Sequence, residues 1–595
     1  MTIAEHPVVS DPLIAKDIAR FELELERYLA NGTDDDRFRV FRLGNGIYGQ
    51  RQGGTNQMVR VKIPYGGLNP EQLEMMGEIA DTYSRGWGHI TTRQNIQFHF
   101  VELTRVPGVL HALGSVGMTT REACGDTVRN VMGCHLAGAC PFEVLDITPW
   151  AEATFRYFVR HPYAQRLPRK FKINFSGCAT DCGQAMFNDV GVVAVGRPLP
   201  DGTVEAGFRV FIGGGLGANP HPAIALEEFT PREDLLATIE AVLRTFDHYG
   251  NRDNKLRARL KWVVDAMGVD EIKERVIKER RFLLGSATYP GGVPAIVLEA
   301  GDAPAGMATG VEVDSVGYNG GVSVMINGRD PFTRWEQANV VRGNAKGTVS
   351  AIAYAKLGDI TSEQFRALAA IQREFHASVR LTNRQNIAFR DLTEEQIPAL
   401  YERLDAIGMA QPGAELARDV VSCPGADTCN LAVTQSRGLA SAIGEAIEEA
   451  GLGEVGGVRI NISGCTNSCG QHHVADIGFL GVERRAHGQA APGYQLQLGG
   501  HLADTMVAFG QKALRLPAKN CGEAAVRLIG KYANEREKAE TFPSWMERIG
   551  GVAVLADELR DLDFFPKPDE GPEFYIDYDE TGPYVAETGE SECAT

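Results

Sequence analysis

Two groups of four cysteines with the same internal spacing constrain this chain of 595 residues more than any other feature. The first quartet is Cys134, Cys140, Cys178 and Cys182, and the second quartet is Cys423, Cys429, Cys465 and Cys469. In each quartet, five residues separate the first two cysteines and three separate the last two. Buried cysteines that act as small hydrophobic residues explain one such pair, but they do not produce the same spacing twice.

The segments around the cysteines repeat as well. GHITTRQNIQFH (88–99) matches VRLTNRQNIAFR (379–390), and FKINFSGCATDCGQAMFNDVGVV (171–193) matches VRINISGCTNSCGQHHVADIGFL (458–480). A repeat separated by roughly 290 residues is far longer than the 20–50 residues of a solenoid unit. The chain is therefore predicted to consist of two homologous halves, related by an approximate two-fold axis, that build one site between them.

Each half begins with the same order of expected elements. Alternating and helical apolar patterns predict strand, helix, strand and helix over residues 56–64, 68–85, 89–100 and 106–118, and again over 347–356, 361–375, 378–390 and 394–409. A larger α/β segment with a cysteine quartet follows each copy. The Gly- and Pro-rich residues 283–310 are the predicted junction of the halves. The fold class is α+β.

Composition excludes several classes of function. The chain has 60 Lys and Arg against 77 Asp and Glu, a formal charge of −17, whereas nucleic-acid binders usually carry a basic surface. No apolar stretch approaches the length of a membrane span, and the N-terminus lacks the pattern of a signal peptide. We therefore expect a cytoplasmic protein with neither a nucleic-acid nor a membrane partner.

In such a compartment, clustered cysteines indicate metal or redox chemistry rather than disulfides. Four thiolates can bind zinc or an iron–sulfur cluster. Structural zinc sites commonly pair cysteines two to four residues apart, so the five-residue gaps favour a cluster while leaving zinc open. Cys465 and Cys469 lie in a Gly/Ser/Asn turn, where free backbone N–H groups can bind thiolate and sulfide.

Six motifs together identify a family. RVKIPYGG, TTRQNIQFH, GDTVRN, LPRKFK, CPGADTC and SGCTNSCGQHHVADIGF resemble the sirohaem-dependent sulfite and nitrite reductases, nearest their ferredoxin-dependent sulfite reductase branch, over residues 40–550. The resemblance implies two halves that enclose a sirohaem, with a 4Fe–4S cluster joined to the haem iron through one cysteine thiolate. It also implies that each half has a ferredoxin-like β-α-β-α module and a larger α/β domain for the sirohaem and the cluster.

This resemblance divides the chain into six expected parts. They are an N-terminal extension (1–39), a ferredoxin-like module (40–120) and a reductase domain (121–285) of the first half, a ferredoxin-like module (305–412) and a sirohaem and 4Fe–4S domain (413–550) of the second half, and an acidic C-terminal extension (551–595). From Lys567 onward the tail is expected to be solvated, with contact to a partner as the alternative.

The resemblance assigns the site residue by residue. The cluster ligands would be the second quartet, with Cys469 also the axial ligand of sirohaem. The anion pocket would contain Arg60, Arg129, Lys170 and Lys172, and the haem carboxylates would be held by Arg93, Gln97 and His99 from one face of a strand. The plainer alternatives are solvated surface charges for the four cations and a buried core histidine for His99.

Two features favour sulfite over nitrite as the substrate. The nitrite branch of the family typically has Asn where this chain has Lys172. Tyr48 and Cys124 match a pair that some sulfite reductases of the family cross-link beside the sirohaem, although Cys124 could equally be a plain buried thiol. The expected reaction is thus the six-electron reduction of sulfite to sulfide, with nitrite reduction to ammonia as the alternative.

The partners and the first quartet complete the expectations. Because no nucleotide-binding motif opens a βαβ unit, electrons should come from a separate ferredoxin or a similar one-electron donor. A non-catalytic iron–sulfur carrier is the more distant alternative. The family's first half usually lacks a cysteine quartet, so the first quartet here is either a second cluster site or a remnant of the duplication. One 4Fe–4S cluster is expected and a second is possible.

Overall fold

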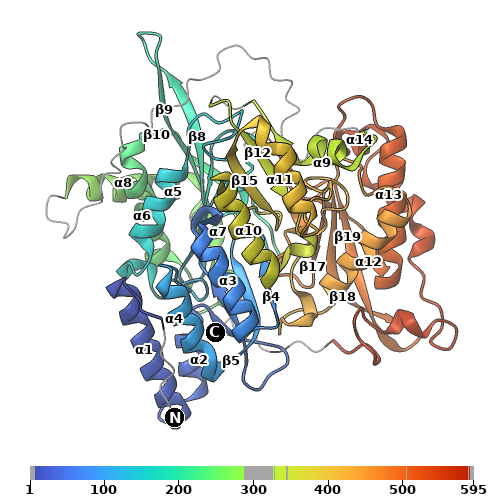
Figure 1. Cartoon of the computed structure of the whole chain (residues 1–595), viewed down its shortest axis with the longest axis horizontal. Helices are drawn as coiled ribbons and strands as arrows, with labels where there is room; N and C mark the ends of the chain where they lie inside the picture. The colour runs from blue at the N-terminus through green and yellow to red at the C-terminus, as the bar shows by residue number, and fades with distance from the viewer. Residues whose placement is uncertain are drawn as a thin grey trace.

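A computed structural model describes residues 7–286, 326, 328–343, 346–503, 506–586 and 589. Most of the predicted junction of the halves, residues 287–310, lies outside the described residues. Four five-stranded sheets dominate the molecule, two of them in the ferredoxin-like modules and two in the larger domains. Figure 1 shows the modules at the centre, between the two larger domains. The predicted α+β fold with internal duplication is confirmed.

The first module contains the predicted strands and helices with one correction. Its elements are β1 (Ile47–Gly49), β2 (Asn56–Val61), α3 (Pro70–Tyr83), β4 (Trp87–Ile90), β5 (Ile96–Glu102) and α4 (Val106–Ser115). The single strand expected over 89–100 is instead a hairpin, because residues 91–95 form a turn in which Gln94 is left-handed (φ 54°). The Thr91 hydroxyl stabilises this turn by accepting from the N–H groups of Arg93 and Asn95, both at 3.2 Å.

The second module repeats this arrangement, hairpin included. Its elements are α9 (Pro331–Asn339), β11 (Val340–Val341), β12 (Val349–Ala353), β13 (Asp359–Thr361), α10 (Ser362–Phe375), β14 (Ser378–Leu381), β15 (Ile387–Leu392) and α11 (Ile397–Asp405). The N-terminus of α10 has a capping box of Thr361 and Gln364, as α3 has one of Asn69 and Gln72, which satisfies N–H groups that a helix start leaves free.

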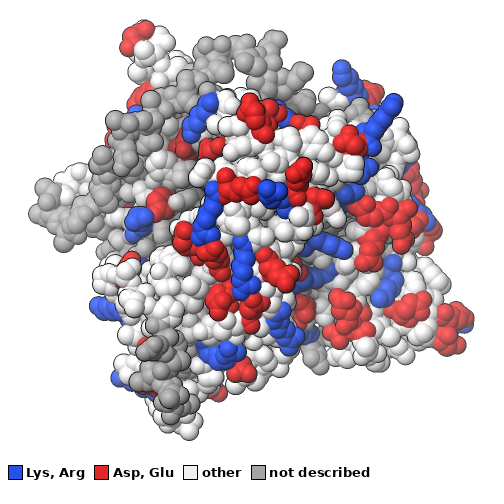
Figure 2. Space-filling view, viewed as in Figure 1, with Lys and Arg blue, Asp and Glu red and all other residues white. Residues whose placement is uncertain are grey.

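The two modules exchange a strand. β13 of the second half pairs antiparallel with β4 of the first, and the short β3 (Gly67–Leu68) of the first half pairs with β14 of the second. Helices α3 and α10 lie side by side (Figure 1) and are joined by ion pairs such as Arg366–Asp81 at 2.6 Å. The buried residues of both modules form one continuous hydrophobic core. On the face of the molecule in Figure 2, basic and acidic side chains are interspersed.

Each larger domain is built on a mixed sheet with the same start. In the first half, β6 (Val128–Gly133), β7 (Phe171–Ser176) and β8 (Val190–Pro198) are parallel, and β9 (Val204–Ile212) and β10 (Ile224–Thr230) continue antiparallel. In the second half, β16 (Val421–Ser422), β17 (Ile460–Ser463) and β18 (Ile477–Ala486) are parallel, followed by β19 (Gln489–Leu498) and β22 (Gln511–Pro517).

Helices cover both sheets. Those of the first domain are α5 (Thr148–Phe158), α6 (Leu235–Tyr249), α7 (Leu260–Met267) and α8 (Val269–Gly285). Those of the second are α12 (Ser436–Glu449), α13 (Cys521–Glu535), α14 (Phe542–Arg548) and α15 (Val552–Glu558), beside a small ribbon of β20 (His501–Ala503) and β21 (Met506–Ala508). No helix among the described residues is long and apolar enough to cross a membrane.

Both terminal extensions pack against the body of the protein. The N-terminal residues form α1 (Pro12–Leu29) and α2 (Asp35–Gly44), and α1 buries Ile14, Ile18 and Phe21 in the core of the modules. The acidic tail is not simply solvated as expected. Its Asp577 carboxylate accepts from the N–H of Gln435 at 2.9 Å, and its Tyr584 hydroxyl donates to the carbonyl of Val433 at 2.9 Å, so the tail lies along the loop that follows Cys429.

Candidate functional site

A large cleft opens between the two halves. Its empty volume, which includes the space open to solvent at its mouth, is about 1590 Å³. It is lined by the β4–β5 hairpin, the residues at the start of β7 and the loops that carry the second quartet. All the predicted site residues line this one cleft: Arg60, Arg93, Gln97, His99, Arg129, Lys170, Lys172, Cys423, Cys429, Cys465 and Cys469.

The predicted anion-binding cations come from three strands of the first half. Arg60 on β2 donates to the hydroxyl of Tyr48 at 2.8 Å and lies over its ring, with 4.7 Å from the guanidinium carbon to the ring centroid. Arg129 on β6 is buried and donates through Nε to the carbonyl of Gly125 at 2.9 Å. These contacts fix the directions of the side chains, so the solvated-surface alternative does not describe Arg60 or Arg129.

Lys172 lies among other cations of the cleft. It stands at the start of β7, only partly exposed, and both desolvation and repulsion from Arg93, Arg259 and Lys170 lower the pKa of its ammonium well below the usual value. The buried Asp189 opposes this shift, but its carboxylate already pairs with Arg259 at 2.8 Å. A bound anion would relieve this repulsion. Sequence reasoning did not single out Arg259 or Asp189: Arg259 lies outside the cysteine repeat, and Asp189 lies within the repeated segment 171–193 but was not recognised as a site residue.

Arg93 lies at the tip of the β4–β5 turn rather than on a strand face. Its Nη1 donates to the side-chain oxygens of Asn174 and Asn188 at 3.0 and 3.2 Å, and its Nη2 donates to the carbonyl of Asn130 at 2.7 Å. Its buried Nε has no partner among the described residues. Burial and the neighbouring Arg129 lower the pKa of Arg93 to about 9, although the more distant Asp189 opposes this shift. The hydrogen-bond partners of its guanidinium are amide and carbonyl oxygens.

Gln97 and His99 follow on β5 and face the same cleft. With its amide oxygen toward Arg60, Gln97 accepts from the guanidinium Nε at 3.0 Å. His99 is buried and stacked on Trp87, with ring centroids 5.5 Å apart, and neither ring nitrogen has a partner among the described residues. Burial lowers the pKa of His99 well below its usual value. A core histidine normally satisfies its polar atoms, whereas neither ring nitrogen of His99 is satisfied by the described residues.

The second quartet is held on two tight loops beside the cleft. After β17, Ser468 and Gln471 adopt left-handed backbone conformations (φ 57° and 63°). Gly470 lies so close to the preceding strand that a Cβ there would stand 1.9 Å from the carbonyl oxygen of Ile462. Cys423 Sγ accepts from the N–H of Gly464 at 3.3 Å. Cys469 is the exposed thiol of the quartet, while Cys423, Cys429 and Cys465 are half-buried.

Residues of the first half fix these loops from across the interface. The Thr92 hydroxyl donates to the carbonyl of Cys469 at 2.8 Å, next to Arg93 in the same turn. Arg51 donates to the carbonyl of Ala432 at 3.0 Å, in the loop after Cys429. Gln184 of the first half and Gln471 of the second bond to each other through their amides at 2.9 and 3.0 Å. The site therefore depends on both halves, as predicted from the duplication.

The first quartet lies on the equivalent loops of the first half, away from the cleft. Cys134, Cys140 and Cys178 are buried and Cys182 is half-buried. Cys140 lies within hydrogen-bond reach of Cys178, and Cys134 within reach of Cys182. Among the described residues, no three His, Cys, Asp or Glu side chains are placed to hold a single metal ion.

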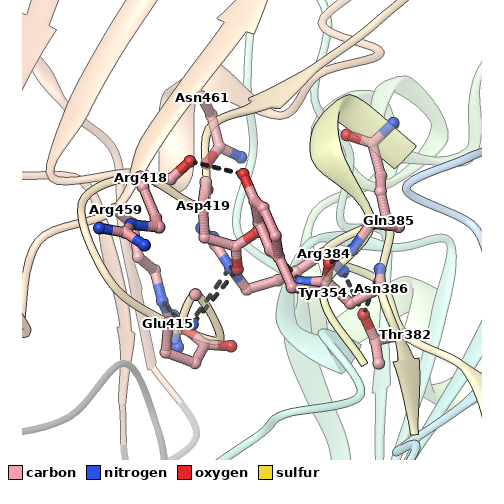
Figure 3. A network of polar contacts seen from close by, with 12 residues as sticks. Tyr354, Thr382, Arg384, Gln385, Asn386, Glu415, Arg418, Asp419, Arg459 and Asn461 are labelled. Carbon is pink, nitrogen blue, oxygen red and sulfur yellow. Dashed lines mark hydrogen bonds and ion pairs between the residues drawn. The ribbon is translucent and has the colours of Figure 1, made fainter. Parts of the chain in front are cut away.

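A second, smaller cavity lies at the place related to the cleft by the duplication. Its empty space is about 460 Å³, and it is lined by Cys182, Arg384 and Arg459 among others. Ion pairs close it (Figure 3): Arg384 contacts Asp419 at 3.1 Å and Glu415 at 3.5 Å, and Arg459 contacts Glu415 at 2.9 Å. We call this region the closed site.

The cleft fits a large anionic cofactor beside a cluster. It leaves the Nε of Arg93 and both ring nitrogens of His99 without partners among the described residues, and it is large and lined by cations. Four thiols converge on one wall, which is the ligand set of a 4Fe–4S cluster. The residues present therefore suit sirohaem and a cluster held by the second quartet.

Comparison with known proteins defines the class. The model of the nitrite and sulphite reductase 4Fe-4S domain matches residues 124–282 and 413–558, and the model of the nitrite/sulfite reductase ferredoxin-like half domain matches 48–116 and 342–407. The chain belongs to the nitrite and sulphite reductase family and is an oxidoreductase. The family implies an iron–sulfur cluster and sirohaem as cofactors.

Individual relatives carry both substrate names. The chain is 30% identical to an assimilatory ferredoxin-dependent nitrite reductase of Haloferax mediterranei, over 89% of this chain and 90% of the relative. It is 29% identical to a sulfite reductase [ferredoxin] of Mycobacterium tuberculosis, over 82% of each. The solved structure of the Mycobacterium tuberculosis NirA protein superposes with a TM-score of 0.72 at 26% identity, covering 91% of this chain and 96% of that one.

Tyr48 and Cys124 stay a predicted pair. Tyr48 lines the cleft, and Cys124 is fully buried beside Ala123, which also lines it.

Proposed function

We propose that this protein reduces sulfite to sulfide in the cleft, taking electrons one at a time from a ferredoxin. The observation that carries the proposal is Lys172, a partly buried cation that stands near Arg93, Arg259 and Lys170 and is opposed by the Asp189 carboxylate, which already pairs with Arg259. Sulfite carries more negative charge than nitrite near neutral pH, so it gains more from this excess of positive charge. The ferredoxin-dependent relatives named above support the choice of donor.

The cofactors supply the electron transfer when they are bound, and the protein supplies charge, orientation and protons. Cys423, Cys429, Cys465 and Cys469 would hold the cluster, with Cys469 facing the haem. Arg93, Gln97 and His99 would hold haem carboxylates. Because Arg93 is fixed by three hydrogen bonds, it presents its charge in one orientation.

The four remaining cations act on the anion itself. Arg60 and Arg129 offer planar guanidinium groups to oxyanion oxygens, and Lys170 and Lys172 offer transferable protons. Six electrons and six protons convert hydrogen sulfite to hydrosulfide and three waters. A bound anion favours the charged form of Lys172, against the burial and repulsion that lower its pKa, and Lys172 Nζ can pass a proton to a departing oxygen.

Substrate preference tests the proposal through Lys172→Asn. In a partly desolvated site, a charge-assisted hydrogen bond contributes about 1.5–3 kcal/mol. We expect kcat/KM for sulfite to fall by roughly ten- to hundredfold, with nitrite turnover much less affected or improved. Both anions are measured with the same reduced ferredoxin, because a damaged donor site would slow both equally. Equal losses for both anions, or none for either, would contradict the role of Lys172.

Nitrite reduction to ammonia is the second candidate, favoured by the Haloferax mediterranei relative. A wild-type kcat/KM that is higher for nitrite than for sulfite would select it. An iron–sulfur carrier without catalysis needs neither the cations nor a large cleft, and purified protein that lacks sirohaem absorption would point to that function instead.

A further inference from the structure

The first quartet sits on a backbone frame that repeats the frame of the second. In the first half, the Ser176 hydroxyl accepts from the N–H of Gly183 at 3.1 Å, and the Asn174 amide donates to the carbonyl of Gly183 at 2.8 Å. In the second half, Ser463 and Asn461 make the same two bonds to Gly470 at the same 3.1 and 2.8 Å. The loop between the last two cysteines is thus fixed identically in both halves.

The unusual backbone of this loop is also retained. Asp181 and Gln184 are left-handed (φ 58° and 59°), as Ser468 and Gln471 are in the second half. A Cβ on Gly183 would lie 1.9 Å from the carbonyl oxygen of Phe175, the same separation as at Gly470. Left-handed residues cost free energy unless the surroundings require them. A mere remnant of duplication has no reason to keep both of them and the glycine.

The four thiols lie near one another in two close pairs. Cys140 approaches Cys178 and Cys134 approaches Cys182, and Cys178 also influences Cys182 electrostatically. Cys134 and Cys140 lie in the hydrophobic core of the first domain, where a cluster would be shielded from water. None of the four forms a disulfide in the described residues. Their pairing could also suit two disulfides, so the experiment below separates the two outcomes.

The loops that carry the last two cysteines of each quartet are joined through a pair of glutamines. Cys182 and Cys469 each stand two residues before the bonded glutamines Gln184 and Gln471. Each cysteine carbonyl accepts a hydrogen bond from the other half: Cys182 from Asn383 at 2.7 Å and Cys469 from Thr92 at 2.8 Å. Next to Cys182 lies the closed site, whose 460 Å³ compares with 1590 Å³ in the cleft. It has room for no second macrocycle.

We propose that Cys134, Cys140, Cys178 and Cys182 bind a second 4Fe–4S cluster, one without a haem partner. The loop frame, the proximity of the thiols and the burial of Cys134 and Cys140 carry this assignment. Its place beside the loops of the second quartet suits an electron store, which takes one electron from the same ferredoxin-type donor and returns it toward the cleft. The assignment does not depend on whether sulfite or nitrite is the substrate.

The test counts metal rather than turnover. Wild-type protein, purified and reconstituted anaerobically with iron and sulfide, is assayed for iron, acid-labile sulfide, zinc and extracted sirohaem. Two clusters and one sirohaem contain about nine irons per chain, whereas one cluster and one sirohaem contain about five. Nine irons and eight sulfides per sirohaem are the roughly expected values. Five irons per sirohaem, or disulfides between these cysteines in the intact mass, would overturn the proposal.

A matched pair of variants locates the extra iron. Cys178→Ala should lose about four irons per chain while sirohaem absorption stays unchanged. Cys521→Ala removes another buried thiol, which lies at the start of α13 outside both quartets, and it should keep the full count. An unchanged count in the Cys178 variant would also refute the assignment. Because wild-type iron is counted independently, a variant that fails to fold does not hide the answer.

Discussion

Arg93 and Arg384 occupy equivalent turns of the two halves, yet one borders an open cleft and the other a closed network. The Nη2 of each donates to an equivalent carbonyl, that of Asn130 at 2.7 Å and that of Asp419 at 2.6 Å. Beyond that bond they differ. Arg384 has the carboxylates of Asp419 and Glu415 beside it, while amides surround Arg93.

The electrostatics of the two arginines diverge accordingly. Burial opposes the charged form of both, but Glu415 and Asp419 raise the pKa of Arg384 above its usual value, whereas the pKa of Arg93 falls to about 9. The same contrast separates Lys172 from Arg459, the next equivalent pair of cations, since only Arg459 has its own carboxylate, at 2.9 Å. A buried cation without a partner is costly. In the proposed function, a bound anion offsets this cost in the cleft.

The largest effect should come from the exposed cysteine of the cleft. Cys469→Ser removes the thiolate that would join the cluster to the haem, so turnover should fall at least about a thousandfold and the magnetic coupling of haem and cluster should be lost. Cys182→Ser, at the equivalent place beside the closed site, should keep normal sirohaem absorption and coupling. Electron paramagnetic resonance and steady-state rates measure both variants. Normal sulfite reduction by the Cys469 variant would contradict the axial assignment.

Opening the closed site should destabilise the protein. Asp419→Asn places at position 419 the residue type that the first half has at 130, and it leaves Arg384 short of one carboxylate in a nearly buried pair. The free energy of unfolding should fall by about 3 kcal/mol, measured by denaturant titration, and added sulfate should recover part of the loss. Stability equal to the wild type would show that the ion pair is not what closes this site.

The reverse change should weaken the cleft. Asn188→Asp provides Arg93 with a carboxylate at the cost of the bond from the Asn188 amide to the carbonyl of Gln184. Neutralising one cation should weaken sulfate binding and raise the KM for sulfite by about tenfold, or about 1.4 kcal/mol, with a smaller change in kcat. Calorimetry and initial rates test this. Unaltered anion affinity would mean that the charge of Arg93, placed beside the haem carboxylates, does not contribute to the potential felt by the anion.

The smallest expected effect is the uptake of a fraction of a proton when an anion binds. A bound dianion favours the charged form of Lys172 and raises its lowered pKa, so binding takes up a proton and affinity falls as pH rises through the pKa of the complex. Sulfate, whose charge does not change near neutrality, is titrated calorimetrically in two buffers of different ionisation enthalpy. The wild type should take up between zero and about one proton, and Lys172→Asn should take up less. The same uptake in both would assign the proton to another group.

The sequence predicted the duplication, the cleft residues and the shared site, because cysteine spacing and short polar motifs survive in the linear order. It missed what depends on distant pairing. The strand expected over 89–100 is a hairpin, since its turn uses a left-handed Gln94 rather than the Gly or Asn that marks such turns. Arg259 reaches Asp189 from a helix start 70 residues away, and no pattern announces the pair.

The acidic tail was wrongly expected to be solvated for a similar reason. Its charges suggested exposure, but Asp577 and Tyr584 bind backbone groups of the loop after Cys429. Almost every residue has a backbone N–H and a carbonyl, so the sequence does not show which of them a side chain will bind. Charge composition therefore describes the average of the tail and not its contacts.

The exchange of strands between the modules has a consequence for synthesis on the ribosome. His89 on β4 pairs with Asp359 on β13, 270 residues later in the chain. At about 5–20 residues per second, the edge of β4 waits about 14 to 54 seconds for its partner strand. An unpaired edge is a template for pairing with another chain. Polysomes of this protein therefore hold neighbouring chains with complementary open edges, and strand-swapped dimers are the misassembly to expect when translation slows between the halves.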